Sequence, residues 1–199
     1  MVRIGLSVEG PTEERFVKAV LAPYLSSKNI YITPISMEGN VSVDRAKSEL
    51  KKIANSFDYV TTLYDFYGFK KKNENESKAS LEKRLEDAVH ESVKSRLIPY
   101  VQMYEFEGVL FSCPEAMERG LNESGVKEWC QGVLDQFNNE PETINNSVET
   151  APSKRLAKAT GYRKTTHGPN IAKEIGIDKI REMCSGFNDW LTKLEALAV

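Results

Sequence analysis

Acidic residues follow apolar, strand-like stretches at separate places in this chain. Glu9 follows RIGLSV, Asp65 follows YVTTLY, and Glu105 and Glu107 follow PYVQMY. In an open parallel α/β sheet, the carboxyl ends of the strands line the crevice in which ligands bind, so carboxylates from distant positions can converge there. Hard divalent cations such as Mg²⁺ prefer oxygen ligands of this kind. The pattern therefore predicts a metal site at one edge of a sheet.

The surroundings of Glu9 and Asp65 allow both a functional and a structural interpretation. In VEGPTEE, Gly10 permits a sharp turn that leaves Glu9 at the strand end, and Thr12 can cap the next helix. Asp65 lies among apolar and aromatic residues, where an ionised carboxylate needs a cation or several hydrogen bonds. Alternatively, Glu9 stabilises a helix N-terminus and Asp65 forms a turn with Gly68.

Glu105 and Glu107 flank Phe106 in YEFEGVLFS. In an extended strand, residues two apart point to the same face, so the two carboxylates are expected to be neighbours. Like charges in an apolar setting are unfavourable unless a metal neutralises them or one acid is protonated. The alternative is an exposed edge strand with both acids in solvent.

A second kind of chemistry is suggested by the basic stretch PSKRLAKATGYRKTTHGP. Arg155, Arg163, Lys164 and His167 in this stretch are candidate contacts to the phosphates of nucleic acid, and Lys164 or His167 could stabilise a leaving group. The alternative is a solvated loop whose charges offset the acidic edge. His90 lies within a predicted helix and is interpreted as structural or exposed.

The elements that would position these residues alternate between strand and helix. Strands are predicted over 3–8, 30–36, 59–65 and 99–111, and helices over 16–27, 41–57, 81–97 and from residue 112, with a polar loop over 68–80. Strands that alternate with helices imply a parallel sheet covered on both faces. We expect an α/β core over residues 1–120 and a helical C-terminal extension over 121–199, with helices over 125–138 and on either side of Ser185 and Gly186.

Composition describes an ordinary globular protein. The chain has 199 residues, 40% hydrophobic and 28% charged, enough for one domain with a buried core. Its net charge of −2 gives no general attraction to nucleic acid, so phosphate binding would depend on local patches or metal ions. No apolar run approaches the roughly 20 residues that span a bilayer. The three cysteines have no metal-ligand spacing, and we expect a cytoplasmic protein without membrane partners.

Other common sites are absent from the sequence. It contains no GxxxxGK[ST] loop, no GxGxxG, no HExxH, no paired CxxC and no GxSxG. These absences disfavour a P-loop nucleotide hydrolase, a Rossmann cofactor site, structural zinc and a serine-nucleophile hydrolase.

With these motifs in order, nearly the whole chain resembles the DUF4276 family, which is similar to a divergent branch of Toprim-fold proteins related to the nuclease domains of OLD-type enzymes. The resemblance rests on VEGPTEE, TTLYDFYGF, YEFEGVLFS and the late run from PSKRLAKATGYRKTTHGP to IREMC. It implies a small, mainly parallel sheet between helices. It also implies that Glu9 and Asp65 match the Toprim acids that hold Mg²⁺. The second aspartate of the DxD element is replaced by Tyr67, so Glu105 and Glu107 are the expected substitutes.

The resemblance implies a nuclease that hydrolyses phosphodiester bonds with one or two Mg²⁺ or Mn²⁺ ions held by Glu9, Asp65, Glu105 and Glu107, with Lys164 on the phosphate charge. Relatives of this kind imply a role in antiviral defence beside an AAA or SMC-like ATPase partner, with a homo-oligomer as a further expectation. Two alternatives stay open: a non-catalytic Toprim-like subunit of a defence complex, and a metal-dependent phosphatase or phosphotransferase. The choice between DNA and RNA also stays open.

Overall fold

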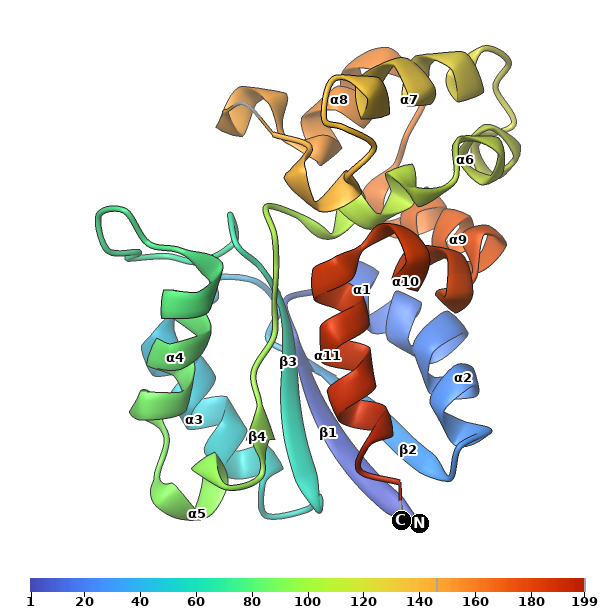
Figure 1. Cartoon of the computed structure of the whole chain (residues 1–199). Helices are drawn as coiled ribbons and strands as arrows, with labels where there is room; N and C mark the ends of the chain where they lie inside the picture. Colours follow the sequence, from blue (N-terminus) through green and yellow to red (C-terminus); the bar gives the residue numbers. More distant parts are fainter. Residues whose placement is uncertain (146, 199) are drawn as a thin grey trace.

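A computed structural model of the chain, which describes residues 1–145 and 147–198, has a parallel sheet between helices (Figure 1). The strand order is β2-β1-β3-β4, and the short β5 pairs with β3. All of these pairings are parallel. The strands are Val2–Val8 (β1), Ile30–Ser36 (β2), Tyr59–Asp65 (β3), Leu97–Ile98 (β4) and Val101–Gln102 (β5). The predicted mainly parallel α/β fold is confirmed.

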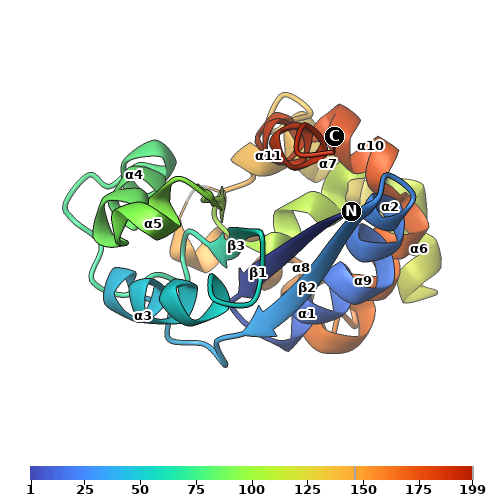
Figure 2. The same ribbon diagram turned by 90° about the horizontal axis from the view of Figure 1, so that it is seen from below.

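Helices cover both faces of the sheet (Figure 2). One face carries α3 (Val43–Ile53), α4 (Lys78–Ala88) and α5 (Glu91–Lys94). The other carries α1 (Pro11–Phe16), the π-helical turn η1 (Val17–Leu21), α2 (Ala22–Ser26) and α11 (Ser185–Glu195). Strands buried on both faces are expected to read as apolar runs, as β1 and β3 do.

The C-terminal half is helical and packs into the main core. After the 3₁₀ helix η2 (Phe106–Ser112) come α6 (Pro114–Leu121), α7 (Val126–Asp135), the 3₁₀ turns η3 (Pro141–Thr143) and η4 (Val148–Thr150), α8 (Pro152–Ala159), α9 (Lys164–Ile175) and α10 (Ile177–Met183). Trp190 of α11 stacks on Tyr100 with ring centroids 4.6 Å apart, and its indole N–H donates to Thr61 Oγ1 at 2.8 Å. The core is thus built from both ends of the chain. The boundary at residue 120 stays a prediction.

The predicted strand over 99–111 is wrong beyond Gln102. Tyr104 has a left-handed backbone with φ 58°, which few non-glycine residues adopt, and the chain then enters η2. The turn is held by Asp65, whose Oδ1 accepts a hydrogen bond from the backbone N–H of Phe106 at 2.7 Å. Local sequence gave no sign of it, because the partner lies 41 residues earlier.

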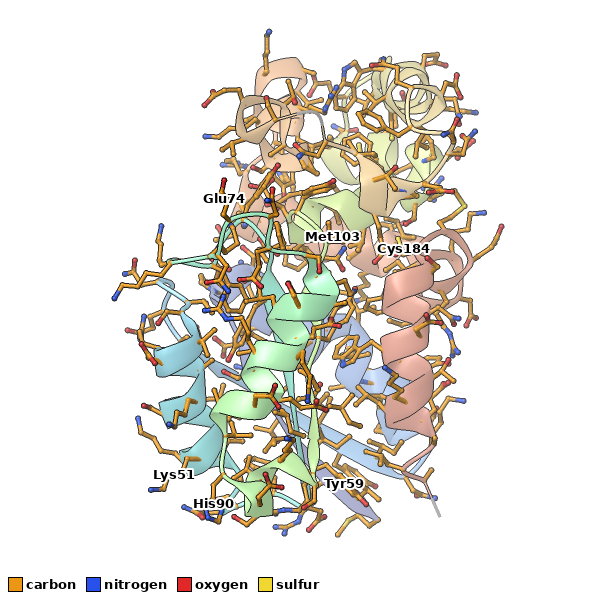
Figure 3. The ribbon with its side chains drawn as sticks, turned by 60° about the vertical axis from the view of Figure 1, so that its left-hand side comes forward. Lys51, Tyr59, Glu74, His90, Met103 and Cys184 are labelled. Atoms are coloured by element: carbon orange, nitrogen blue, oxygen red, sulfur yellow. The ribbon has the colours of Figure 1, made fainter. Side chains whose placement is uncertain are left out.

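The structure differs from two of the predicted helices. The first helix begins at Pro11, five residues before the predicted start, because Pro11 suits the first helical position. The helix predicted over 81–97 breaks between α4 and α5 at His90 (labelled in Figure 3), whose ring Nδ1 accepts from the Ser92 N–H at 3.2 Å and caps α5.

The basic stretch, whose structural interpretation was a solvated loop, forms α8 and the start of α9. Pro169 lies inside α9 and cannot donate a hydrogen bond to the carbonyl of Thr165, four residues earlier. Arg15 Nη1 donates to that carbonyl instead, at 2.6 Å. A residue distant in sequence therefore compensates for the proline and allows the helix.

None of the described helices combines the length and the apolar character needed to cross a bilayer.

Candidate active site

Glu9 and Asp65 lie at the carboxyl edge of the sheet, where β1 and β3 end side by side. The strand order places β2 on one side of β1 and β3 on the other, so this edge is a topological switch point, the usual ligand site of such sheets. Asp65 is 4% exposed. Glu9 Oε2 is buried and accepts no hydrogen bond from the described residues. Gly68 leaves room for Glu9, because a Cβ at position 68 would lie 2.0 Å from Glu9 Oε2.

Glu13 joins these two acids, although it is not among the site residues predicted from the sequence. It is buried in the first turn of α1, and its Oε2 accepts from the Gly10 N–H at 3.0 Å. This contact turns the carboxylate back toward the strand end, as in a capping box. The signal was present in the sequence as a Glu three residues after the turn glycine, but capping alone does not predict a functional role.

Glu107 enters the same site from η2, whereas Glu105 is engaged by the backbone at the start of α8. Glu107 is fully buried, and the Tyr162 hydroxyl donates to its Oε1 at 3.2 Å. Glu105 Oε2 instead accepts from the Ser153 N–H at 2.9 Å, at the start of α8. The expectation that both side chains share one face of a strand is wrong, because η2 replaces the strand and separates them.

Lys164, the first residue of α9, lies among the carboxylates. Its Nζ is 3.3 Å from Glu107 Oε2, 3.6 Å from Asp65 Oδ2 and 4.0 Å from Glu13 Oε1. The Lys164 side chain is 43% exposed, so the centre opens to solvent on the lysine side. One ammonium group therefore faces acids from β3, η2 and α1.

The centre carries more negative than positive charge. Burial raises the pKa of Glu9, of Glu107 and, most strongly, of Asp65, and repulsion between neighbouring carboxylates adds to the rise, while Lys164 opposes it. The pKa of Lys164 is raised, because attraction to Asp65 and Glu107 outweighs the effect of its partial burial. Burial and Glu107 raise the pKa of Tyr162, which keeps its hydroxyl a donor.

The donor set fits a hard divalent cation in its chemistry. Glu9 Oε2, Glu13 Oε1 and Glu107 Oε2 are buried oxygens that accept no hydrogen bond from the described residues. Such carboxylate oxygens are the ligands that Mg²⁺ and Mn²⁺ prefer. As the side chains stand, no group of three His, Cys, Asp or Glu residues in the described chain is arranged to hold a metal ion. The ammonium of Lys164 provides the counter-charge in this arrangement.

Tyr67, at the position where a second aspartate was expected, points to a different neighbour. Its hydroxyl accepts a hydrogen bond from Asn145 Nδ2, and its ring lies 5.3 Å from that of Tyr104. The acids that complete the centre therefore come from α1 and η2.

The other candidate phosphate-binding residues are spread over α8 and α9. Arg155 Nε donates to the Thr150 carbonyl at 2.7 Å, and its guanidinium lies 5.2 Å from the Phe137 ring centroid. Arg163 is exposed at the start of α9, and His167 Nδ1 accepts from the Arg163 N–H at 3.2 Å. Of this set, the structure brings only Lys164 into the carboxylate centre.

One family model and two solved structures are similar to this chain. The family model described as "Domain of unknown function (DUF4276)" matches residues 8–195. The C-terminal region of the Burkholderia pseudomallei OLD protein is similar at 15% identity and a TM-score of 0.53, over 100% of both chains. The C-terminal region of the Xanthomonas campestris pv. campestris OLD protein gives 16% identity and a TM-score of 0.45, over 98% of this chain and 95% of that one. No curated protein matches the chain.

At 15% identity, the likeness to the Burkholderia region shows a shared fold. The family match extends from the strand end beside Glu9 to the last turn of α11, and so includes the whole carboxylate centre. The chain therefore belongs to the DUF4276 family.

Proposed function

We propose that this protein is a nuclease that hydrolyses phosphodiester bonds at the carboxylate centre with a divalent cation, Mg²⁺ or Mn²⁺. The observation that carries the proposal is the convergence of buried carboxylate oxygens without hydrogen-bond partners around a single ammonium group. Buried acids in such excess are costly in a purely structural role, because each charge needs a counter-charge or a proton.

Glu9, Glu13, Asp65 and Glu107 would hold the cation. When bound, it would activate water for attack on phosphorus and stabilise the charge that develops on the phosphate oxygens. The chain holds these ligands in place beforehand: the Phe106 N–H fixes Asp65, the Gly10 N–H fixes Glu13, and the Tyr162 hydroxyl fixes Glu107. Lys164 is near enough to the acids to neutralise them, and its exposed side is the one from which a phosphate could approach.

A second candidate is a non-catalytic subunit of a defence complex. It is favoured by Tyr67 in place of a second aspartate and by Lys164, which already supplies a counter-charge. In that case Lys164 would be a permanent partner of the acids. A metal-dependent phosphatase would use the same centre but release inorganic phosphate without cutting a chain. The family resemblance also implies an ATPase partner and a role in defence, and we include both in the proposal that the protein is a nuclease.

The test is a cleavage assay on plasmid DNA, linear DNA and tRNA with Mg²⁺ or Mn²⁺, repeated with any ATPase that is encoded beside this protein. The wild type should cut at least one substrate, and the double variant Glu9→Gln, Asp65→Asn should cut none. The matched control is Glu91→Gln, which removes a carboxylate that is 85% exposed, and it should cut like the wild type. Equal inertness of wild type and double variant under all conditions would rule out the nuclease and favour the non-catalytic subunit.

A further inference from the structure

A groove of about 370 Å³ lies between α7 and α8, apart from the carboxylate centre. Its lining includes Trp129, Val133, Glu149, Lys154, Arg155 and Lys158. One wall is thus largely apolar and aromatic, and the other is basic.

The two lysines of the groove are available to a ligand. Lys154 and Lys158 are exposed and lie four residues apart on α8, so they project from the same side of the helix. Neither has an ion-pair partner within residues 1–145 and 147–198, although Glu149 lies in the same lining. Three basic groups against one acid make the groove complementary to an anion.

The walls of the groove are held by internal contacts. The ring of Trp129 is half-buried and packs against Phe111 with centroids 5.7 Å apart. Arg155 is held by the Thr150 carbonyl and the Phe137 ring, and so braces α8. An aromatic face beside unpaired lysines is the combination that binds unpaired bases and their phosphates.

The segment 152–162, which contains α8, contacts Glu105 and Glu107 at two places. At the start of α8, the Ser153 N–H donates to Glu105, two residues before Glu107. Just after its end, the Tyr162 hydroxyl donates to Glu107 itself. The segment that lines one wall of the groove therefore also supplies the hydroxyl that positions Glu107.

We propose that the groove between α7 and α8 binds a single-stranded segment of the nucleic-acid substrate, with phosphates on Lys154 and Lys158 and a base stacked on Trp129. This inference rests on the proposed function, because it assigns that function a substrate form. Stacking on Trp129 requires a base released from pairing, so single strands should bind in preference to duplexes.

Fluorescence anisotropy measures binding of labelled oligo-dT, oligo-U and a duplex of equal length to the protein. All samples contain EDTA, so that binding to the groove is measured without metal-dependent cleavage. Lys154→Ala with Lys158→Ala should weaken single-strand binding and reduce the salt dependence of log K by about 0.7 per lysine. Trp129→Leu should weaken binding about 5- to 150-fold, whereas Trp129→Phe, which keeps a stacking face, should stay near wild type.

The matched control is Lys47→Ala with Lys51→Ala, a pair with the same spacing and charge on α3. Lys51 lies at the end of the molecule opposite α7 and α8 (Figures 1 and 3). The control should bind like the wild type. Equal losses in both lysine pairs, no loss in either, or tighter binding of the duplex would overturn the proposal. The comparison of oligo-dT with oligo-U shows which sugar is preferred. Since binding is measured without metal, a failed groove and an inactive centre give separate results.

Discussion

Replacement of Lys164 by Met should destabilise the protein because it leaves Asp65 and Glu107 without their shared counter-ion. Removal of one partner from a fully buried ion pair costs about 3–5 kcal/mol. Lys164 is 43% exposed, so solvent screens part of that interaction. About half of the buried value remains, which gives a loss of about 2 kcal/mol in the free energy of unfolding near neutral pH.

The loss should depend on pH in a defined direction. The pKa values of Asp65 and Glu107 are raised above their ordinary values of 3.8 and 4.5, so the folded state binds more protons than the unfolded state above those values. Stability from these groups is therefore lost as pH rises through the raised pKa values and regained as pH falls. In Lys164→Met this dependence of stability on pH should be steeper. The difference in free energy of unfolding between variant and wild type should therefore shrink as pH falls toward the ordinary pKa values of the two acids.

Urea unfolding followed by circular dichroism in EDTA measures the difference. Replacement of EDTA by Mg²⁺ or Mn²⁺ should raise the urea midpoint more in Lys164→Met than in the wild type, because the cation replaces the lost counter-charge. Lys18→Met is the control, since the ion pair of Lys18 with Glu14 lies at the surface and should contribute at most about 0.5 kcal/mol. The reasoning is refuted if Lys164→Met is as stable as the wild type near neutral pH, or if its deficit grows as pH falls.

Three further predictions concern the carboxylate centre and the glycine beside it. Asp65→Asn keeps an acceptor for the Phe106 N–H and removes a buried charge, so urea unfolding should show equal or higher stability while cleavage is lost. Gly68→Ala should displace Glu9, since the new Cβ would lie 2.0 Å from its Oε2, and a calorimetric titration should show weaker Mn²⁺ binding. Gly132→Ala, which has open space around it, should bind Mn²⁺ like the wild type. Cleavage rate should rise with pH through the raised pKa values of Glu9, Asp65 and Glu107, because the proposed ligands must be deprotonated, and a pH–rate profile flat down to pH 4.5 would contradict this.

The sheet and the position of two acids could be predicted from sequence because they follow from local patterns. Apolar runs in β1 and β3 end at Glu9 and Asp65, and parallel strands bring such ends to one edge. The covering helices followed from helical spacing in the same way. What was predicted correctly thus depended on short-range periodicity.

The rest of the site depends on contacts between distant residues. The turn that directs Glu107 inward uses a left-handed Tyr104 and a hydrogen bond from Phe106 to Asp65. The helix that carries Lys164 contains a proline. Arg15, which is distant in sequence, donates a hydrogen bond to the carbonyl that the proline leaves without its helical partner. Neither arrangement has a local signature, so sequence patterns could not show that Lys164 lies among the acids.

The central claim is that the carboxylate centre binds a divalent cation. Electron paramagnetic resonance of Mn²⁺ during a protein titration measures this directly, because bound Mn²⁺ loses the sharp signal of the free ion. The wild type should bind Mn²⁺ saturably, Mg²⁺ should compete, and the double variant Glu9→Gln, Asp65→Asn should leave the ion free. A wild type that binds no Mn²⁺, or a double variant that binds it equally well, would contradict the claim.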